Sequence, residues 1–385
     1  MRWFVLAVLF AAAAGGGTSP GSAAQNPAPL LIVLGGEFEQ WQAEASRRGW
    51  LLASPHAELL AAPGDELAKG IEKIIADVSE RIAVDPARVY LAGAGPLTPA
   101  VFYVRGRMPH LWAAAAALGG SPKAAIDSNR LFAANVRLVP MLWTREADDG
   151  SADRLRAAGY PVTVRTQSEA GLAGAFDFLA PHRRDPEPET VDCETGSLAF
   201  LRCYWVEITK VDPALRNDAV PVTRVPPGSG ASLALGRFGF DPSQPGPGLV
   251  VSGLPKGYQG PLHAGDRILA VGGKPVGSAQ DYLRLMDGIR EEKAVAVTIG
   301  RGKRILRLET RTVLPKRAEN VTVRVRASWS PDTRELLMMT RGVAALRFQL
   351  SAGRAPARVN WNGREMGEAD RTGCWEVDGG LLPCR

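Results

Sequence analysis

The segment that most constrains the fold is a short apolar run, residues 89–92, that leads directly into glycine. Val-Tyr-Leu-Ala is followed by Gly93-Ala-Gly95-Pro96-Leu, and residues 99–107 can then form a helix. A continuous apolar run bounded by glycine is typical of a strand buried on both faces of a parallel sheet. The order of strand, sharp glycine turn and helix therefore predicts an α/β domain with this turn at the edge of its sheet.

The same alternation extends through residues 25–185. Three other segments are expected to be strands: residues 30–34, 50–53 and 136–143. The clearest helix spans residues 66–82, with its apolar side chains on one face and Asp65 as the expected N-cap. Repeated alternation of strands and helices predicts a doubly wound parallel sheet with helices on both faces.

Four pieces of this region resemble the α/β-hydrolases of the polyhydroxybutyrate-depolymerase and feruloyl-esterase type. They are Leu-Ile-Val-Leu-Gly-Gly, Arg-Arg-Gly-Trp-Leu-Leu-Ala-Ser-Pro, Ile-Ala-Val-Asp-Pro-Ala-Arg-Val-Tyr-Leu-Ala-Gly and Met-Pro-His-Leu-Trp-Ala-Ala-Ala-Ala-Ala-Leu-Gly-Gly. The resemblance implies a G-x-S-x-G nucleophile elbow at residues 93–97. It also implies an acid in the loop after the strand ending at Trp143, and a histidine before the last helix.

The catalytic positions of that family are altered in this chain. Gly95 stands where the serine nucleophile is expected, and Pro96 has no N–H to donate to an oxyanion. Asp148 or Asp149 could be the remnant acid, with Asp148 the first candidate, but residues 167–171 contain no histidine. Loss of one oxyanion donor alone costs about a hundredfold to a thousandfold in turnover. We therefore predict a hydrolase scaffold without hydrolase chemistry.

Two alternative functions would still use the substrate cleft that the hydrolase resemblance implies. An unorthodox nucleophile would make the chain a carboxylic-ester hydrolase, and Ser54 and Ser121 are the serines to test. The four histidines, expected in loops or at the surface, are His56, His110, His182 and His263. A polymer or sugar ligand without cleavage is the second alternative, and the aromatic candidates for stacking on it are Trp41, Trp50 and Trp143.

The N-terminus has the layout of a secretory signal peptide. A charged start, an apolar run from Trp3 and the small residues Ser-Ala-Ala predict cleavage after residue 24. We expect an exported, periplasmic or extracellular bacterial protein, with an uncleaved N-terminal anchor as the alternative. No integral membrane segment is expected after cleavage. A net charge of +6 over 385 residues is too modest to indicate a nucleic-acid binder, and no cofactor is predicted.

The four cysteines fall into two close pairs, Cys193 with Cys203 and Cys374 with Cys384. An even number of cysteines in an exported chain favours disulfides, here two local ones. A zinc site built from all four lacks the usual C-x-x-C spacing, so no metal site is predicted.

Beyond the linker-like residues 181–188, the sequence indicates a small β domain in two pieces. Residues 186–228 carry its first strand at 201–209, and residues 318–385 carry the rest. The later strands are expected at residues 321–325, 343–350 and 357–361, and Asn362-Gly363 predicts a type I′ hairpin turn.

Between these pieces, residues 229–317 resemble a PDZ domain of the bacterial periplasmic kind. The resemblance rests on Gly-Arg-Phe-Gly-Phe at 236–240 and on Leu-His-Ala-Gly-Asp-Arg-Ile-Leu-Ala-Val-Gly-Gly-Lys-Pro-Val at 262–276, followed by a helix at 278–288 and a strand at 294–301. It implies capture of a peptide or protein C-terminus. The predicted binding residues are Arg237, Phe238, Gly239, Phe240, Val250 and Tyr282.

In this arrangement the N–H groups of residues 238–240 would converge on a terminal carboxylate. The peptide would add as a strand to residues 249–252, with side chains entering beside Tyr282 and Leu285. The alternative is a groove filled by the chain itself, with the domain serving as a spacer. The basic run at 301–311 is expected to be an edge strand with a charged face rather than a polyanion site. The sequence as a whole thus predicts an exported, non-catalytic binding or scaffold protein.

Overall fold

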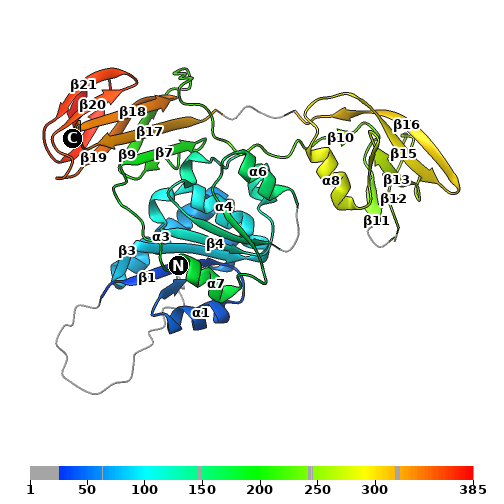
Figure 1. Ribbon diagram of the computed structural model, residues 1–385, viewed down its shortest axis with the longest axis horizontal. Coiled ribbons are helices and arrows are strands. Elements are labelled where there is room, and N and C mark those ends of the chain that lie inside the picture. Colours follow the sequence, from blue (N-terminus) through cyan, green and yellow to red (C-terminus); the bar gives the residue numbers. More distant parts are fainter. Residues whose placement is uncertain are drawn as a thin grey trace, which may run out of the picture. The chain divides into compact units, whose positions relative to one another are not determined.

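The computed structural model describes residues 26–62, 64–145, 149–241, 244, 246–316 and 321–384. The chain forms two compact units (Figure 1). The first comprises described residues within 1–226 and 320–385, and the second those within 227–319. The predicted signal peptide and Asp148 lie outside the described residues.

The first unit contains a six-stranded sheet in which every neighbouring pair is parallel. The strand order is β2-β1-β3-β4-β5-β6, with β1 at Ala28–Leu34, β2 at Leu51–Ala53, β3 at Val84–Ala94, β4 at Ala114–Leu118, β5 at Met141–Arg145 and β6 at Thr163–Thr166. The helices of this region are α1 at Phe38–Arg47, α2 at Ala57–Leu60, α3 at Gly64–Arg81, α4 at Thr98–Arg107, α5 at Lys123–Asp127, α6 at Ser151–Ala157 and α7 at Leu172–Leu179.

Alternate residues of β1 enter two separate hydrophobic cores, one on each face of the sheet. Leu30 and Ile32 pack in the core that includes α3, α4 and α6. Leu31 and Val33 pack in the core that includes α1 and α7. Figure 1 shows α1 and α7 on one side of the sheet and α3 and α4 on the other. The predicted doubly wound parallel arrangement is therefore present.

Two details of the α/β region differ from the sequence prediction. The strand expected at 136–143 is instead a 3-10 turn at Ala134–Val136 followed by β5. The carbonyl oxygens of Val136 and Val139 accept hydrogen bonds from the buried Arg105 guanidinium, at 3.2 and 3.0 Å, and so are diverted from a sheet. Asp65 is not an N-cap, because α3 begins at Gly64 and the Asp65 carboxylate accepts hydrogen bonds from Tyr103 and Ser197.

The rest of the first unit contains two five-stranded sheets that share one core. One has the order β21-β20-β18-β17-β7 and the other β23-β22-β19-β9-β8. The strands are β7 at Thr190–Thr195, β8 at Arg202–Cys203, β9 at Val206–Val211, β17 at Val323–Ser330, β18 at Glu335–Arg341, β19 at Val343–Leu350, β20 at Ala357–Trp361, β21 at Arg364–Ala369, β22 at Gly373–Val377 and β23 at Leu381–Pro383. Each sheet combines strands from before and after residues 227–319.

Local backbone conformation explains why one sequence prediction in this region is right and another is wrong. Asn362 and Gly363 have φ values of 52° and 81°, as the predicted type I′ turn between β20 and β21 requires. The single strand expected at 201–209 is wrong, because Tyr204 has φ 54° and divides it into β8 and β9. An L-residue with positive φ cannot continue a strand.

Both predicted disulfides are formed. Cys193 on β7 bonds to Cys203 on β8, so this bridge joins the two sheets, and Cys374 on β22 bonds to Cys384 after β23. Over the described stretches of chain, no helix is long and apolar enough to cross a membrane. The same stretches contain no cluster of three or more histidine, cysteine or carboxylate side chains placed to hold a metal ion.

The second unit is an antiparallel sheet with one helix. The sheet order is β10-β16-β15-β13-β12-β11, with β14 paired to β13. The elements are β10 at Ser232–Leu233, β11 at Gly239–Asp241, β12 at Leu249–Gly253, β13 at Arg267–Val271, β14 at Lys274–Pro275, α8 at Ala279–Asp287, β15 at Ala294–Arg301 and β16 at Arg304–Val313. Because β10 pairs only with Thr312 and Val313, most of β16 is an edge strand, as its alternating charges predict.

Candidate functional site

The turn after β3 has the strand, turn and helix order that the sequence predicts for a nucleophile elbow. β3 ends at Ala94, residues Gly95–Leu97 form one 3-10 turn, and α4 begins at Thr98. Gly95 has φ 57°, in the left-handed region that L side chains rarely adopt. A Cβ atom added there would meet no atom within 4 Å. The turn therefore has a residue in the left-handed region and open space beside it, which is compatible with the predicted elbow.

Glycines around this turn are required by close packing. A Cβ on Gly93 would lie 2.6 Å from Val101 Cγ2 and 2.7 Å from the Leu34 carbonyl oxygen. A Cβ on Gly120, in the loop after β4, would lie 2.0 Å from the Gly95 carbonyl oxygen. At Gly95 the glycine relieves backbone strain, whereas at Gly93 and Gly120 it prevents a steric clash.

A chain of neutral hydrogen bonds ties together the carboxyl ends of four strands. The Thr98 hydroxyl donates to the Gly119 carbonyl at 2.7 Å, and the Gly119 N–H donates to the Thr144 hydroxyl at 2.9 Å. The Thr144 hydroxyl in turn donates to the Gln167 side-chain oxygen at 2.6 Å. Gln167 belongs to the segment where the histidine is expected. An amide does not titrate near neutral pH, so this group cannot serve as a general base.

Of the two carboxylate candidates, only Asp149 is among the described residues, and its side chain is not bonded to a histidine there. Asp148 lies outside the described residues, and its role as a remnant acid stays a prediction. Asp149 accepts hydrogen bonds from the Ser121 hydroxyl and from the Ser151 N–H, the latter at 2.9 Å. Ser121 thus faces a carboxylate with no imidazole between them. The Ser54 hydroxyl donates to the Val33 carbonyl at 2.9 Å.

The side chains of two of the histidines have partners other than a serine. His56 Nδ1 accepts from the Leu59 N–H at 3.3 Å and caps α2, and His182 Nδ1 lies 2.7 Å from the Phe178 carbonyl oxygen. Burial, and then the nearby charges of Arg202 and Arg184, lower the pKa of His110 to about 3. Among the described residues no imidazole is hydrogen-bonded to a serine hydroxyl, and all four cysteines are in disulfides.

For two of the three tryptophans predicted to stack on a sugar or polymer ligand, the prediction is wrong. Trp41 and Trp143 are 3% and 1% exposed, and both belong to hydrophobic cores. Trp50 stacks on Tyr90 with ring centroids 4.7 Å apart. The buried rings of Trp41 and Trp143 cannot stack on a ligand, whereas Trp50 is half-buried with one face covered by Tyr90.

No family model matches this chain, and no curated protein gives a significant match. Among solved structures, a thermostable esterase matches with 14% identity and a TM-score of 0.30, over 42% of this chain and 56% of the esterase. An aminopeptidase N family protein from Idiomarina loihiensis matches with 20% identity and a TM-score of 0.18, over 33% of this chain and 20% of that protein. The chain thus spans little more than half of one structure and a fifth of the other, and both scores are too low to establish a shared fold.

In the second unit, three of the predicted binding residues form an aromatic cluster. The rings of Phe238 and Phe240 lie 5.4 Å apart, and Phe240 lies 5.2 Å from Tyr282 on α8, edge to face in both cases. Burial raises the pKa of Tyr282 to about 12. The cluster connects β11 to α8, because Phe240 lies on β11 and Tyr282 on α8. Arg237, which precedes Phe238 in the chain, is exposed.

The strand expected to receive a peptide is not the available one. Within β12, Val250 pairs with Asp241 of β11 on one side and with Arg267 of β13 on the other. A strand that is paired on both sides cannot add a third partner, so the predicted contact at Val250 is wrong. The described sheet ends in β10 on one side and in β11 on the other, and the strand that begins at the predicted binding residue Gly239 is β11.

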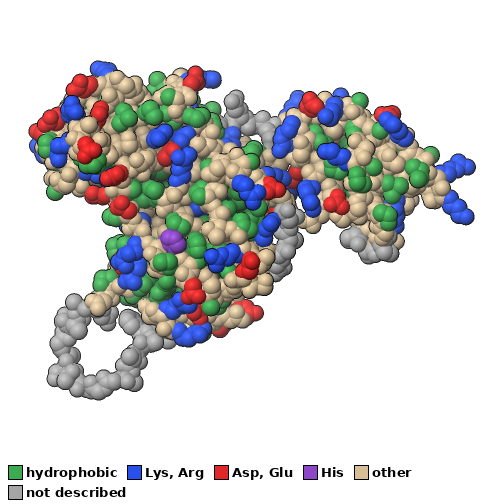
Figure 2. All heavy atoms as spheres, in the orientation of Figure 1, with side chains coloured by type: hydrophobic (Ala, Val, Ile, Leu, Met, Phe, Trp, Pro, Cys, Tyr) green, Lys and Arg blue, Asp and Glu red, His purple; other side chains and the backbone are tan. Residues whose placement is uncertain are grey.

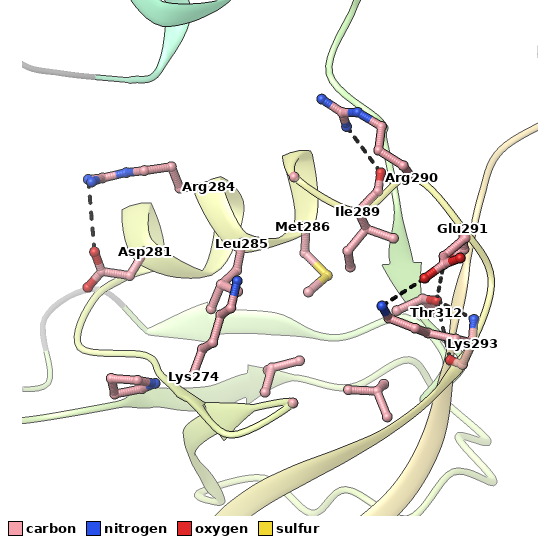
Figure 3. A pocket seen from close by; sticks show the side chains of 15 residues that line it. Lys274, Asp281, Arg284, Leu285, Met286, Ile289, Arg290, Glu291, Lys293 and Thr312 are labelled. Carbon is pink, nitrogen blue, oxygen red and sulfur yellow. Dashed lines mark hydrogen bonds and ion pairs between the residues drawn. The ribbon is translucent and has the colours of Figure 1, made fainter.

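A groove that sequence reasoning missed lies along α8 (Figure 3). It has a volume of about 760 Å³, and its walls come from α8, the loop after α8, the β13–β14 hairpin and the first residues of β15. Leu285, which the sequence predicts beside the peptide together with Tyr282, lines this groove. We call this hollow the α8 groove. Its residues are spread over β13, β14, α8, β15 and β16 and the loops between them, which is why no local motif marks it.

Proposed function

We propose that this chain is a non-catalytic binding protein. In this proposal its α/β region is a hydrolase-type domain that has lost its chemistry, and its second unit is a PDZ domain that captures the C-terminus of a peptide or protein. The observation that carries the first part is Gly95, with its φ of 57° and open space in place of a side chain. The elbow backbone is retained there without a nucleophile.

The surroundings of Gly95 support the same conclusion. Pro96 provides no N–H where an oxyanion donor would be needed, and Pro99 removes a second donor from the first turn of α4. Gln167 bonds to Thr144 where a histidine would be needed. The nucleophile, the base and a donor are thus absent together, while the packing that shapes the turn persists.

Peptide capture by the second unit is supported by its end strand. An extended peptide could pair with β11, and its carboxylate could accept N–H groups from residues 238–240. Phe238, Phe240 and Tyr282 would supply the apolar wall beside the last side chain of the peptide. Arg237 is exposed and could attract the carboxylate.

Binding of C-terminal peptides tests this part directly. Peptides selected from a library with free C-termini should bind the purified protein, and the same peptides with amidated ends should bind at least tenfold more weakly. Arg237→Glu should weaken binding, whereas Arg304→Glu, at the far end of the β15–β16 hairpin, should not. Equal binding of the acid and amide forms would contradict capture of a carboxylate.

We also propose that the protein is exported. The charged, apolar and small-residue segments of residues 1–24 support secretion, and the two disulfides suit an oxidising compartment. The dispersion of charge fits the absence of a nucleic-acid role, since Figure 2 shows cationic and anionic side chains interspersed on both units. N-terminal sequencing of the natural protein should begin at Gln25. Recovery of an intact Met1 would contradict cleavage.

The alternative proposal is an ester hydrolase with a different nucleophile, and Ser121 is its best candidate. The Ser121 hydroxyl donates to Asp149, and Ser121 follows Gly120, which packs against Gly95. A carboxylate could remove the serine proton, although it is a much weaker base than imidazole at neutral pH.

A further inference from the structure

The α8 groove combines an apolar floor with a rim of charged side chains. Val271, Leu285, Met286, Ile289 and Val295 supply the apolar surface. Leu285, Ile289 and Val295 are only partly buried, so the folded unit leaves them in contact with water. A volume of about 760 Å³ falls in the range of ligand pockets, which are mostly apolar with a few polar groups.

The charges on the rim are mostly neutralised by one another. Arg284 lies 3.9 Å from Asp281, and Lys293 lies 2.9 Å from Glu291. Arg290 donates to the Asp287 and Ile289 carbonyl oxygens at the end of α8. Among the described residues, Lys274 has neither an ion-pair nor a side-chain hydrogen-bond partner. Figure 3 shows its side chain rising from β14 toward Leu285, with its ammonium group over the groove.

Four of the backbone N–H groups that line the groove already have acceptors. The Gly288 N–H donates to the Arg284 and Leu285 carbonyls, and the Ile289 N–H donates to Met286. The Gly272 N–H donates to Ala296, and the Lys293 N–H donates to the Thr312 hydroxyl. Pro275 has no N–H at all. A peptide backbone would therefore find few partners here, and burial of unpaired amides is unfavourable.

From these observations we infer that the α8 groove binds a carboxylate with an unbranched alkyl chain, of the fatty-acid class. The alkyl chain lies on Leu285, Ile289 and Val295, and the carboxylate pairs with the Lys274 ammonium. Such a ligand has one anionic group and no amides, which matches an apolar floor beneath Lys274, whose ammonium has no hydrogen-bond or ion-pair partner among the described residues. The site is separate from the proposed peptide site at β11, so it does not rest on the proposed function.

The test is calorimetric titration of the purified full-length protein with octanoate, decanoate and dodecanoate, each below its micelle concentration. Binding should be saturable with one site, and each added methylene should tighten it by up to about fourfold, from about 0.8 kcal/mol per buried methylene. 1-Decanol should bind at least tenfold more weakly than decanoate. No saturable binding, or equal binding of decanol and decanoate, would overturn the inference.

Matched variants locate the site. Lys274→Ala should weaken decanoate binding at least tenfold, and Leu285→Ser should weaken it independently. Lys303→Ala, which removes another exposed lysine of the same unit, should leave it unchanged. Thermal unfolding confirms that each variant is folded. Decanoate binding that survives Lys274→Ala, or that is lost in Phe240→Ala instead, would place the ligand elsewhere and overturn the assignment. Amidated and free-acid peptides titrated in parallel report on the β11 site alone.

Discussion

The carbonyl oxygen of Gly95 lies so close to Gly120 that a Cβ atom added to Gly120 would come within 2.0 Å of it. This contact joins the turn after β3 to the loop after β4. It restrains the backbone of the turn from outside, so packing alone accounts for the left-handed conformation of Gly95.

The two glycines should therefore respond differently to alanine. Gly95→Ala adds a methyl group to open space and should cost only the strain of positive φ, about 1–2 kcal/mol. Gly120→Ala has the same backbone strain and a backbone clash as well, and should cost at least about 2 kcal/mol more. Urea unfolding of both variants measures the difference. Equal losses of stability would contradict the packing described here.

Glu194 is the buried charge on which the β7 region of the first unit depends. Its side chain is fully buried and accepts from Arg341 at 2.8 Å, Thr322 at 2.6 Å and the Thr223 N–H at 2.7 Å. Glu194→Gln should destabilise the protein by about 3–5 kcal/mol, because it leaves Arg341 without a counter-charge in a site that is largely closed to water.

The control for Glu194 is an exposed pair of the same unit. Asp153 and Arg156 form an ion pair at 2.6 Å with side chains that are 73% and 74% exposed. Asp153→Asn should change the free energy of unfolding by less than about 1 kcal/mol. A similar effect of both substitutions would show that the Glu194 network contributes little.

His110 should make the protein sensitive to mild acid. Its pKa is lowered to about 3 by burial and nearby cations, and its Nδ1 is buried without a partner among the described residues. The unfolded chain binds a proton near pH 6.5 and the folded chain does not, so stability falls as the pH decreases from about 6.5 toward 3. The contribution is up to about 1.4 kcal/mol per pH unit.

Unfolding of wild type and His110→Gln at pH 7 and pH 4.5 isolates this effect. Asp85 also has a lowered pKa, since hydrogen bonds from Arg88 and Ala87 outweigh its burial, but this carboxylate acts mainly below about pH 4. The variant should therefore lose less stability between the two pH values than the wild type. An identical loss in both proteins would exclude His110 as the source.

Sequence patterns were sufficient where local chemistry decides the structure. The strands at 294–301, 343–350 and 357–361 have the predicted limits, because alternating side chains and turn residues mark them. The hairpin turn at Asn362-Gly363 is predicted from the conformational preference of these two residues alone. The disulfides followed from close spacing and an even number of cysteines.

Long-range contacts account for the errors. The residues around Val139 were predicted as strand because they are apolar, but Arg105, distant in sequence, takes their carbonyl oxygens. Val250 lies in a correctly predicted strand, but the sequence does not show that β11 and β13 pair with that strand on both sides and leave no free edge for a peptide. The α8 groove could not be foreseen, because its walls meet only in the folded unit.

Ester hydrolysis by the purified wild-type protein tests the central claim most directly, with short-chain aryl esters as substrates and a serine-reactive phosphonate as a covalent probe. We expect no turnover above the uncatalysed rate and no labelled residue, because no nucleophile stands at Gly95 and no histidine is paired with a serine in the described structure. Turnover that persists through further purification, together with a phosphonate adduct on Ser121 or any other residue, would contradict the claim and identify the nucleophile.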